Sequence, residues 1–260
     1  MFSRYMLDTW LLATLVAATA GFVGFFVVIR RASFAAHVLP LGAFPGAAAA
    51  SLLGVNPLLG LLAFAALGVL GITQLERLGR REVATALWLT VALALGTLLL
   101  SMTRQYAQGL YALLFGEVLG VSPGTLLPVA ALCALAVAAT LLQFRRLLLD
   151  ALSSELVAAA GVSARGVELG FLAALALATA TVLPVTGALM VFSLMVGPAS
   201  AARAITDRPP LAAAGSVAFA LLTVWSAIAL SYLSNWPVGF FVGSLGALAY
   251  GVGRLLRRHR

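Results

Sequence analysis

Charged residues are scarce in this chain of 260 residues, at 9% of the total, whereas soluble globular domains carry about 25%. Hydrophobic residues make up 63%. A soluble protein of this size needs a charged surface, and this sequence supplies too little charge to build one. The composition therefore predicts an all-α integral membrane protein, a bundle of about nine transmembrane helices with one short re-entrant helix, and a single transmembrane domain over residues 1–260.

Cysteine and catalytic motifs are rare or absent. Cys133 is the only cysteine, which excludes an intrachain disulfide and a zinc site built from cysteines. The sequence contains no Gly-x-x-x-x-Gly-Lys loop, no His-Glu-x-x-His motif and no Gly-x-Ser-x-Gly motif. We therefore predict that the chain is not an enzyme and that it binds no permanent cofactor.

Lysine is absent, so arginine accounts for all 16 basic residues and for the net charge of +8. A basic excess can indicate a nucleic-acid partner. Here the arginines flank apolar segments and form no basic face, so we predict no nucleic-acid binding. Membrane orientation explains them better, because cytoplasmic loops collect positive charge.

The apolar segments are the main feature of the sequence. A helix needs about 20 residues to cross the hydrocarbon core, and turn residues divide the longer apolar runs at 54–57, 184–187 and 234–237. A shorter apolar segment, 106–120, is the predicted re-entrant helix. The spans are predicted within 9–29, 32–75 (two), 83–103, 125–144, 164–202 (two) and 209–253 (two).

The arginines predict the orientation of this bundle in a cell membrane. With the N-terminus outside, 14 of the 16 arginines fall in inner loops, and only Arg4 and Arg104 lie outside. The C-terminus is then cytoplasmic. The outer turns at 54–57 and 234–237 are short, so the chain can offer a docking surface to an external partner but no large ligand-binding domain of its own.

Two ionisable residues are candidates for contact with a transported cation. His37 falls inside the second predicted span, where an ionisable group usually faces a pathway or a partner, and imidazole is a common ligand of divalent transition metals. The alternative is a neutral histidine hydrogen-bonded to a neighbouring helix. Glu117, in the predicted re-entrant helix, could bind cations at an outer vestibule or be an interfacial acid in contact with water.

The longest mildly polar stretch, 145–168, is predicted to lie inside, and the inner loop that carries a docking helix is placed at about 146–166. Residues 150–160 indicate a short helix that ends at Gly161. A small-residue helix with a few charges is suited to docking a soluble partner, and the alternative is a helix lying on the bilayer surface. The candidate docking residues are Asp150, Ser154, Glu155, Ala159 and Gly161.

Six short motifs, in order, resemble the permease subunits of the zinc, manganese and iron-chelate ABC importers. The resemblance covers nearly the whole chain, and 156–162 resembles the coupling-helix region of that family. The motifs are 30–34 followed by Leu39 and Gly46, 56–60, 113–122, 156–162, 186–199, and Ser231-Tyr232 with Pro237 and Gly239.

The resemblance implies a permease that imports a divalent transition-metal ion (zinc, manganese or iron) or its chelate. It also implies a second permease chain, a soluble ATP-binding subunit that hydrolyses ATP, and an external metal-binding protein. One departure stands out: where the family carries an aspartate and, four residues on, a histidine, this sequence has His37 and Leu41.

A secondary transporter or a cation channel is the alternative function. Such proteins use several ionisable groups near the middle of the membrane. This sequence offers essentially one, His37, which argues against proton-coupled or sodium-coupled transport.

Overall fold

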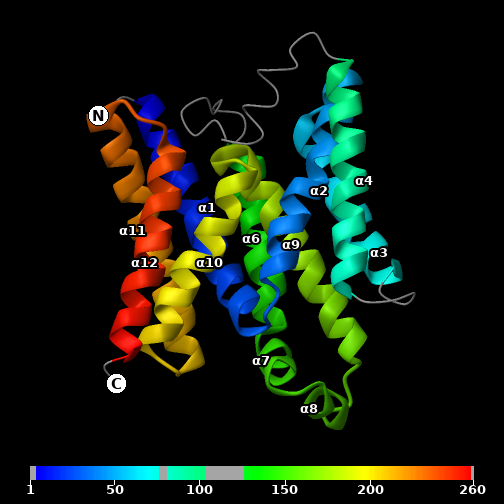
Figure 1. Ribbon diagram of the computed structural model, residues 1–260, viewed down its shortest axis with the longest axis vertical. Helices are drawn as coiled ribbons and strands as arrows, with labels where there is room; N and C mark the ends of the chain where they lie inside the picture. The colour runs from blue at the N-terminus through cyan, green and yellow to red at the C-terminus, as the bar shows by residue number, and fades with distance from the viewer. Residues whose placement is uncertain (1–3, 76–80, 103–125, 259–260) are drawn as a thin grey trace.

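The computed structural model describes residues 4–75, 81–102 and 126–258, and all regular structure in these ranges is helical. Figure 1 shows the long helices running roughly along one direction, with two short helices at one end. The helices are α1 (Arg4–Ile29), α2 (Ser33–Leu52), α3 (Pro57–Leu75), α4 (Arg81–Ser101), α6 (Leu126–Leu142), α7 (Phe144–Leu152), α8 (Ser154–Ala159), α9 (Ala164–Thr186), α10 (Ala188–Ile205), α11 (Pro209–Ser234) and α12 (Val238–Arg258).

Nine of these helices correspond one to one to the nine predicted spans, so the predicted helical bundle is confirmed. Six of them are long and apolar enough by themselves to cross a membrane, and α6 with α7, bent by 57°, makes a seventh. Helices α4 and α10 contribute shorter apolar stretches. The predicted re-entrant helix at 106–120, with Glu117, lies outside the described residues.

The predicted breaks between spans are confirmed, and turn chemistry explains them. Gly54 has φ +68°, and the amide of Val55 reaches back to the carbonyl of Ala50, which closes the end of α2. Asn56 then accepts a hydrogen bond from the amide of Leu58 and caps the start of α3.

The other two breaks also depend on residues with positive φ. Gly187, at φ +79°, separates α9 from α10. Asn235 takes the left-handed conformation after α11, which asparagine tolerates better than most residues. The hydroxyl of Ser231 donates to the carbonyl of Trp236 and holds that turn together.

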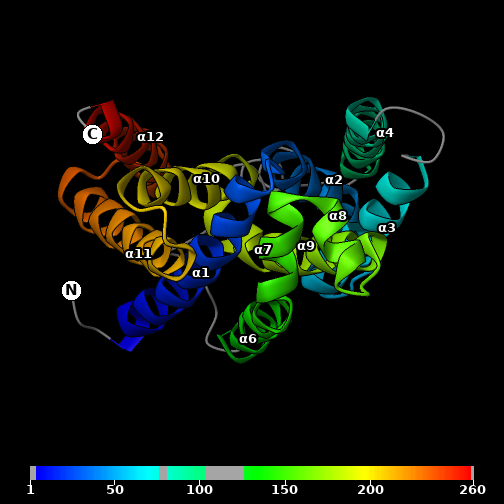
Figure 2. The ribbon, with the colours of Figure 1, turned by 90° about the horizontal axis from the view of Figure 1, so that it is seen from below.

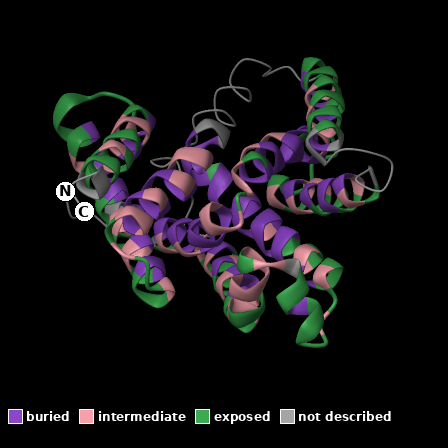
Figure 3. Cartoon of the chain, turned by 60° about the horizontal axis from the view of Figure 1, so that its bottom comes forward, coloured by how far each residue is buried: buried purple, intermediate pink, exposed green. Residues whose placement is uncertain are grey.

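Figure 3 shows the buried residues gathered through the middle of the bundle, and α1, α9 and α10 contribute many of them. Phe25, Phe26 and Phe171 are fully buried there. The hydroxyl of Ser216 on α11 donates to the carbonyl of Gly21 on α1 at 2.6 Å. Such close approach between helices is typical of membrane bundles, where small residues line the contacts.

The termini lie at opposite ends of the bundle, as Figure 1 shows, and this arrangement fits an odd number of crossings. The end with the C-terminus holds the α1–α2 turn, α7, α8 and the α10–α11 turn, and Figure 2 views it directly. We call it the arginine-rich end. The arginines of its described segments include Arg30, Arg31, Arg145, Arg146, Arg165, Arg203, Arg208, Arg254, Arg257 and Arg258.

Candidate functional site

His37 lies on α2, one turn from the start of the helix at Ser33. Its ring is half-buried and meets the ring of Phe192 on α10 edge to face, with 5.3 Å between centroids. Its Nδ1 atom is buried and has no hydrogen-bond partner among the described residues. A buried ring nitrogen without a partner costs free energy unless it binds something, so this atom is available to a ligand.

The described residues around His37 do not complete a metal site. Among the described residues, no three or more histidine, cysteine or acidic side chains gather closely enough to hold a metal ion. Leu41, one turn further along α2, is apolar and half-buried. Glu117, the other predicted cation ligand, lies outside the described residues.

Arg30 forms the most buried charged cluster of the described chain. Its side chain is 5% exposed and lies 2.7 Å from the carboxylate of Asp150, on α7. It also forms a short ion pair with Glu168, on α9. The guanidinium carbon sits 4.6 Å from the ring centre of Phe171, within the range of a cation–π interaction.

This cluster joins three segments that are far apart in the sequence. Arg30 and Glu168 are 138 residues apart. The cluster borders a hollow of about 810 Å³ at the arginine-rich end, to which the α1–α2 turn, α7 and α9 all contribute. The carboxylates of Asp150 and Glu168 both contact the one guanidinium of Arg30, so this side chain ties α7 and α9 to the α1–α2 turn.

The predicted docking helix is two helices instead of one. Ser153 is extended at φ −163° and separates α7 from α8. Its hydroxyl accepts the amide of Glu155, an N-cap bond that competes with continuing the helix. The predicted end is confirmed, because α8 ends at Ala159, Ala160 is its C-cap and Gly161 follows at φ +71°.

The structure separates the predicted docking residues into two groups. Asp150 faces Arg30 and is 14% exposed. Glu155, Ala159 and Gly161 are exposed. Ser154 begins α8. Val157 is 1% exposed and anchors α8 to the core, whereas Glu155, Leu156, Ala158 and Ala159 of this short helix are exposed.

Sequence reasoning missed the roles of Arg30 and Glu168. Arg30 was counted as a marker of orientation and as the start of a family motif, and Glu168 as the end of the polar stretch 145–168. Their pairing crosses most of the chain, and a single sequence carries no local signal for it.

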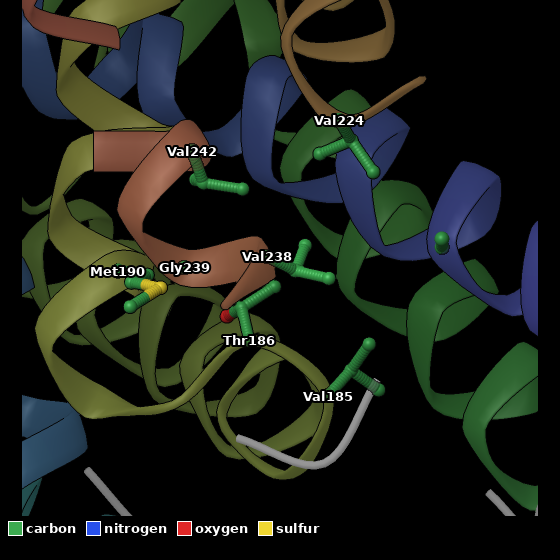
Figure 4. Close-up of a pocket in the computed structure, with 8 residues that line it drawn as sticks. Val185, Thr186, Met190, Val224, Val238, Gly239 and Val242 are labelled. Carbon is green, nitrogen blue, oxygen red and sulfur yellow. The ribbon is translucent and has the colours of Figure 1, made fainter. Parts of the chain in front are cut away.

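The small cavity in Figure 4 is not a ligand site. It lies where α1, α11 and α12 meet the α9–α10 break, and its volume is about 10 Å³. That is room for about one water molecule. Valines dominate its lining, and the one hydroxyl, of Thr186, already donates to the carbonyl of Val182.

Comparison with known proteins identifies the family. Residues 3–253 match the model of the ABC-3 family, the ABC 3 transport family. The manganese transport system membrane protein MntC of Halalkalibacterium halodurans is 24% identical over 252 residues, which cover 95% of this chain and 86% of the relative. The high-affinity zinc uptake system membrane protein ZnuB of Haemophilus influenzae is 25% identical over 241 residues, 92% of each chain.

A solved structure shows the same fold. PsaBC from Streptococcus pneumoniae in complex with Fab matches with a TM-score of 0.88 at 20% identity, over 96% of this chain and 91% of that chain. The resemblance to ABC importer permeases inferred from the six motifs is confirmed. Because the family match covers nearly the whole sequence, the chain belongs to the ABC 3 transport family.

Proposed function

We propose that this chain is the membrane permease subunit of an ABC importer for a divalent transition-metal ion (zinc, manganese or iron) or its chelate. Residues 1–260 form one transmembrane domain. The observation that carries the proposal is the family match over residues 3–253. The assignment of a transition metal as the transported substrate is supported by the names of the relatives, which include manganese and zinc transport proteins.

The transported ion passes His37 on its way through the membrane. An imidazole nitrogen that is buried without a partner is a suitable ligand for a divalent transition metal. One histidine does not coordinate an ion fully, and Leu41 contributes no ligand. The remaining ligands come from a second permease chain, from other helices such as the one predicted to carry Glu117, or from a chelator that travels with the metal.

A soluble ATP-binding subunit docks on the exposed surface of α8. Glu155, Ala159 and Gly161 form the contact surface, with Ser154 at the start of the helix. Asp150 has a different role from the contact residues, because its carboxylate pairs with Arg30 and so connects α7 to the base of α2. ATP hydrolysis on the partner then moves α7 and α8, and the charged cluster passes that movement to the helix that carries His37.

The arginine-rich end faces the cytoplasm of the cell, and the N-terminus lies outside. The excess of arginine at one end supports this orientation. An external metal-binding protein delivers the ion to the short outer turns at 54–57 and 234–237.

Transport by the reconstituted complex tests the proposal. The permease, the candidate ATPase and the candidate binding protein are placed in liposomes, and uptake of zinc, manganese and iron is measured with and without ATP. We expect ATP-dependent uptake of at least one of these metals. Uptake that needs no ATP would favour a secondary transporter or a channel instead, and would contradict the proposal.

A further inference from the structure

A second hollow at the arginine-rich end collects positive charge. It has a volume of about 340 Å³ and lies between the end of α1, α10 and α12. Arg31, Arg203 and Arg254 line it, together with the hydroxyl-bearing side chains of Ser200 and Tyr250. No acidic residue is among its described lining, so an anion entering this hollow meets three cations and no opposing carboxylate.

These arginines are poorly neutralised, in contrast to their neighbour Arg30. Within the described residues, Arg31 and Arg254 form no ion pair. Arg203 approaches Asp207, four residues on, at 3.9 Å, but the carboxylate is 87% exposed. A surface pair of this kind contributes little, so the positive charge of the hollow remains available.

The backbone explains why two adjacent arginines differ so strongly. Arg31 takes the left-handed conformation at φ +56°. The amide of Ala32 bonds to the carbonyl of Val27, and the amide of Arg31 to that of Val28, which is the usual closure of a helix end. This sharp turn leaves the Arg30 side chain buried among its acids and the Arg31 side chain exposed beside the hollow.

The arginines of the hollow lie at the ends of three apolar helices, and such ends meet the headgroup layer when a helix spans a bilayer. Arg31 follows the end of α1, Arg203 lies in the last turn of α10, and Arg254 is near the end of α12. The rest of the lining is apolar and includes Val28 and Ile29. Basic pockets between transmembrane helices on the cytoplasmic side are suited to anionic headgroups.

The neighbouring surface is suited to acyl chains. A hollow of about 420 Å³ lies between α10, α11 and α12, and almost all of its lining is apolar. It shares α10 and α12 with the basic hollow. Both surfaces of this helix pair therefore fit contact with lipid, one with a headgroup and one with acyl chains.

We propose that Arg31, Arg203 and Arg254 bind the phosphate of an anionic phospholipid. Guanidinium groups pair with phosphate through two parallel hydrogen bonds. Arg254 donates to the hydroxyl oxygen of Tyr250 at 3.0 Å, which leaves the Tyr250 proton free to donate to the phosphate. The proposal needs only a membrane-embedded bundle and does not depend on the transported ion.

Thermal unfolding of the purified full-length chain in detergent tests this site. Cardiolipin, phosphatidylglycerol, phosphatidylcholine and inorganic phosphate are added separately at matched concentrations. We expect the two anionic lipids to raise Tm by several degrees more than phosphatidylcholine or phosphate. The double variant Arg203→Gln/Arg254→Gln should lose at least half of that shift. Arg208→Gln, an exposed arginine outside the hollow, is the matched control and should keep it.

A second variant tests the site independently of the Arg203→Gln/Arg254→Gln pair. Arg31→Gly deletes a guanidinium at a position where glycine accepts the positive φ without cost, so the turn is kept. It should also reduce the shift caused by anionic lipid. An equal shift with inorganic phosphate alone would show a soluble anion site and overturn the lipid assignment. A full lipid shift in Arg31→Gly and in the double variant would overturn the site itself.

Discussion

The guanidinium of Arg30 lies 2.7 Å from the carboxylate of Asp150, and this contact joins the base of α2 to the predicted ATPase-docking segment. Arg30 is 5% exposed, and its second partner, Glu168, comes from α9. His37 follows seven residues after Arg30 on the helix that begins at this turn. A shift of α7 therefore reaches the helix of the candidate metal ligand through a single buried cation.

Among the residues of this cluster, Arg30 should lower the stability of the permease most when it is replaced. Arg30→Gln removes the guanidinium that contacts both Asp150 and Glu168, and breaking a buried ion pair costs about 3 kcal/mol or more. Asp150→Asn leaves Arg30 paired with Glu168, so it should lower Tm less than Arg30→Gln does. Thermal unfolding of the purified chain checks the order. Arg31→Gln, at the exposed neighbour, is the control, and an equal loss in all three variants would contradict this account.

Ala159 is exposed on α8 and should belong to the docking surface. Ala159→Arg adds a long charged side chain there and should lower ATP-driven uptake at least tenfold while the Tm of the permease stays unchanged. Met102→Arg places the same side chain at an exposed position directly after α4, outside the two proposed outer docking turns, and should leave coupling intact. Normal uptake by Ala159→Arg in reconstituted vesicles would rule out α8 as the docking site.

Gly46 of α2 and Gly60 of α3 should be needed for the crossing of these helices. A Cβ atom on Gly46 would overlap the carbonyl group of Gly60, and a Cβ atom on Gly60 would overlap that of Gly46. Gly46→Ala should therefore lower stability by about 1–3 kcal/mol, seen as a lower Tm. Gly243→Ala is the control, because a Cβ atom there meets nothing within 4 Å. Equal Tm values for the two variants would show that α2 and α3 separate easily.

The sequence predicted the helices well because their ends depend on local chemistry. Gly54, Gly187 and Asn235 take positive φ at the three predicted breaks. Each break was visible as a short run of glycine, asparagine or proline between apolar segments. The number and the ends of the helices in this chain are thus set by local sequence. In the hydrocarbon core, helices are one of the few backbone structures that can cross the bilayer.

The candidate site was less predictable because its contacts are not local. His37 was identified as an isolated polar residue, but its contact with Phe192 of α10 follows from packing. The Arg30–Glu168 pair is likewise a consequence of how α1 meets α9. The break at Ser153 was missed because a serine N-cap and a helix-interior serine look alike in a sequence until their backbone bonds are known.

The orientation predicts the location of both ends of the chain. The arginine-rich end should face the cytoplasm, and the N-terminus should lie outside. A reporter that is active only in the cytoplasm should work when fused to the C-terminus and fail at the N-terminus. Activity at both ends would require an even number of spans and would contradict the nine-span bundle, in which the termini lie at opposite ends (Figure 1).

His37 should be needed for transport but not for folding. Its Nδ1 atom has no hydrogen-bond partner among the described residues, so His37→Ala leaves no described group unpaired there, and Tm should change little. Uptake of the transported metal should fall at least tenfold, because the candidate pathway loses its ligand, while stimulation of the ATPase by docking should persist. Ser51→Ala is a suitable control on the same helix, since that exposed hydroxyl donates to the carbonyl of Ala47 within its own helix.

A carboxylate at the same position gives the sharper test of the metal ligand. A neutral imidazole binds a divalent ion without adding negative charge, whereas an aspartate adds a full charge and should hold the ion more tightly. His37→Asp should therefore keep uptake and shift its half-saturation to lower metal concentration. Uptake by His37→Ala at the wild-type rate across the whole range of metal concentrations would identify His37 as a packing residue against Phe192, and the ligand hypothesis would be wrong.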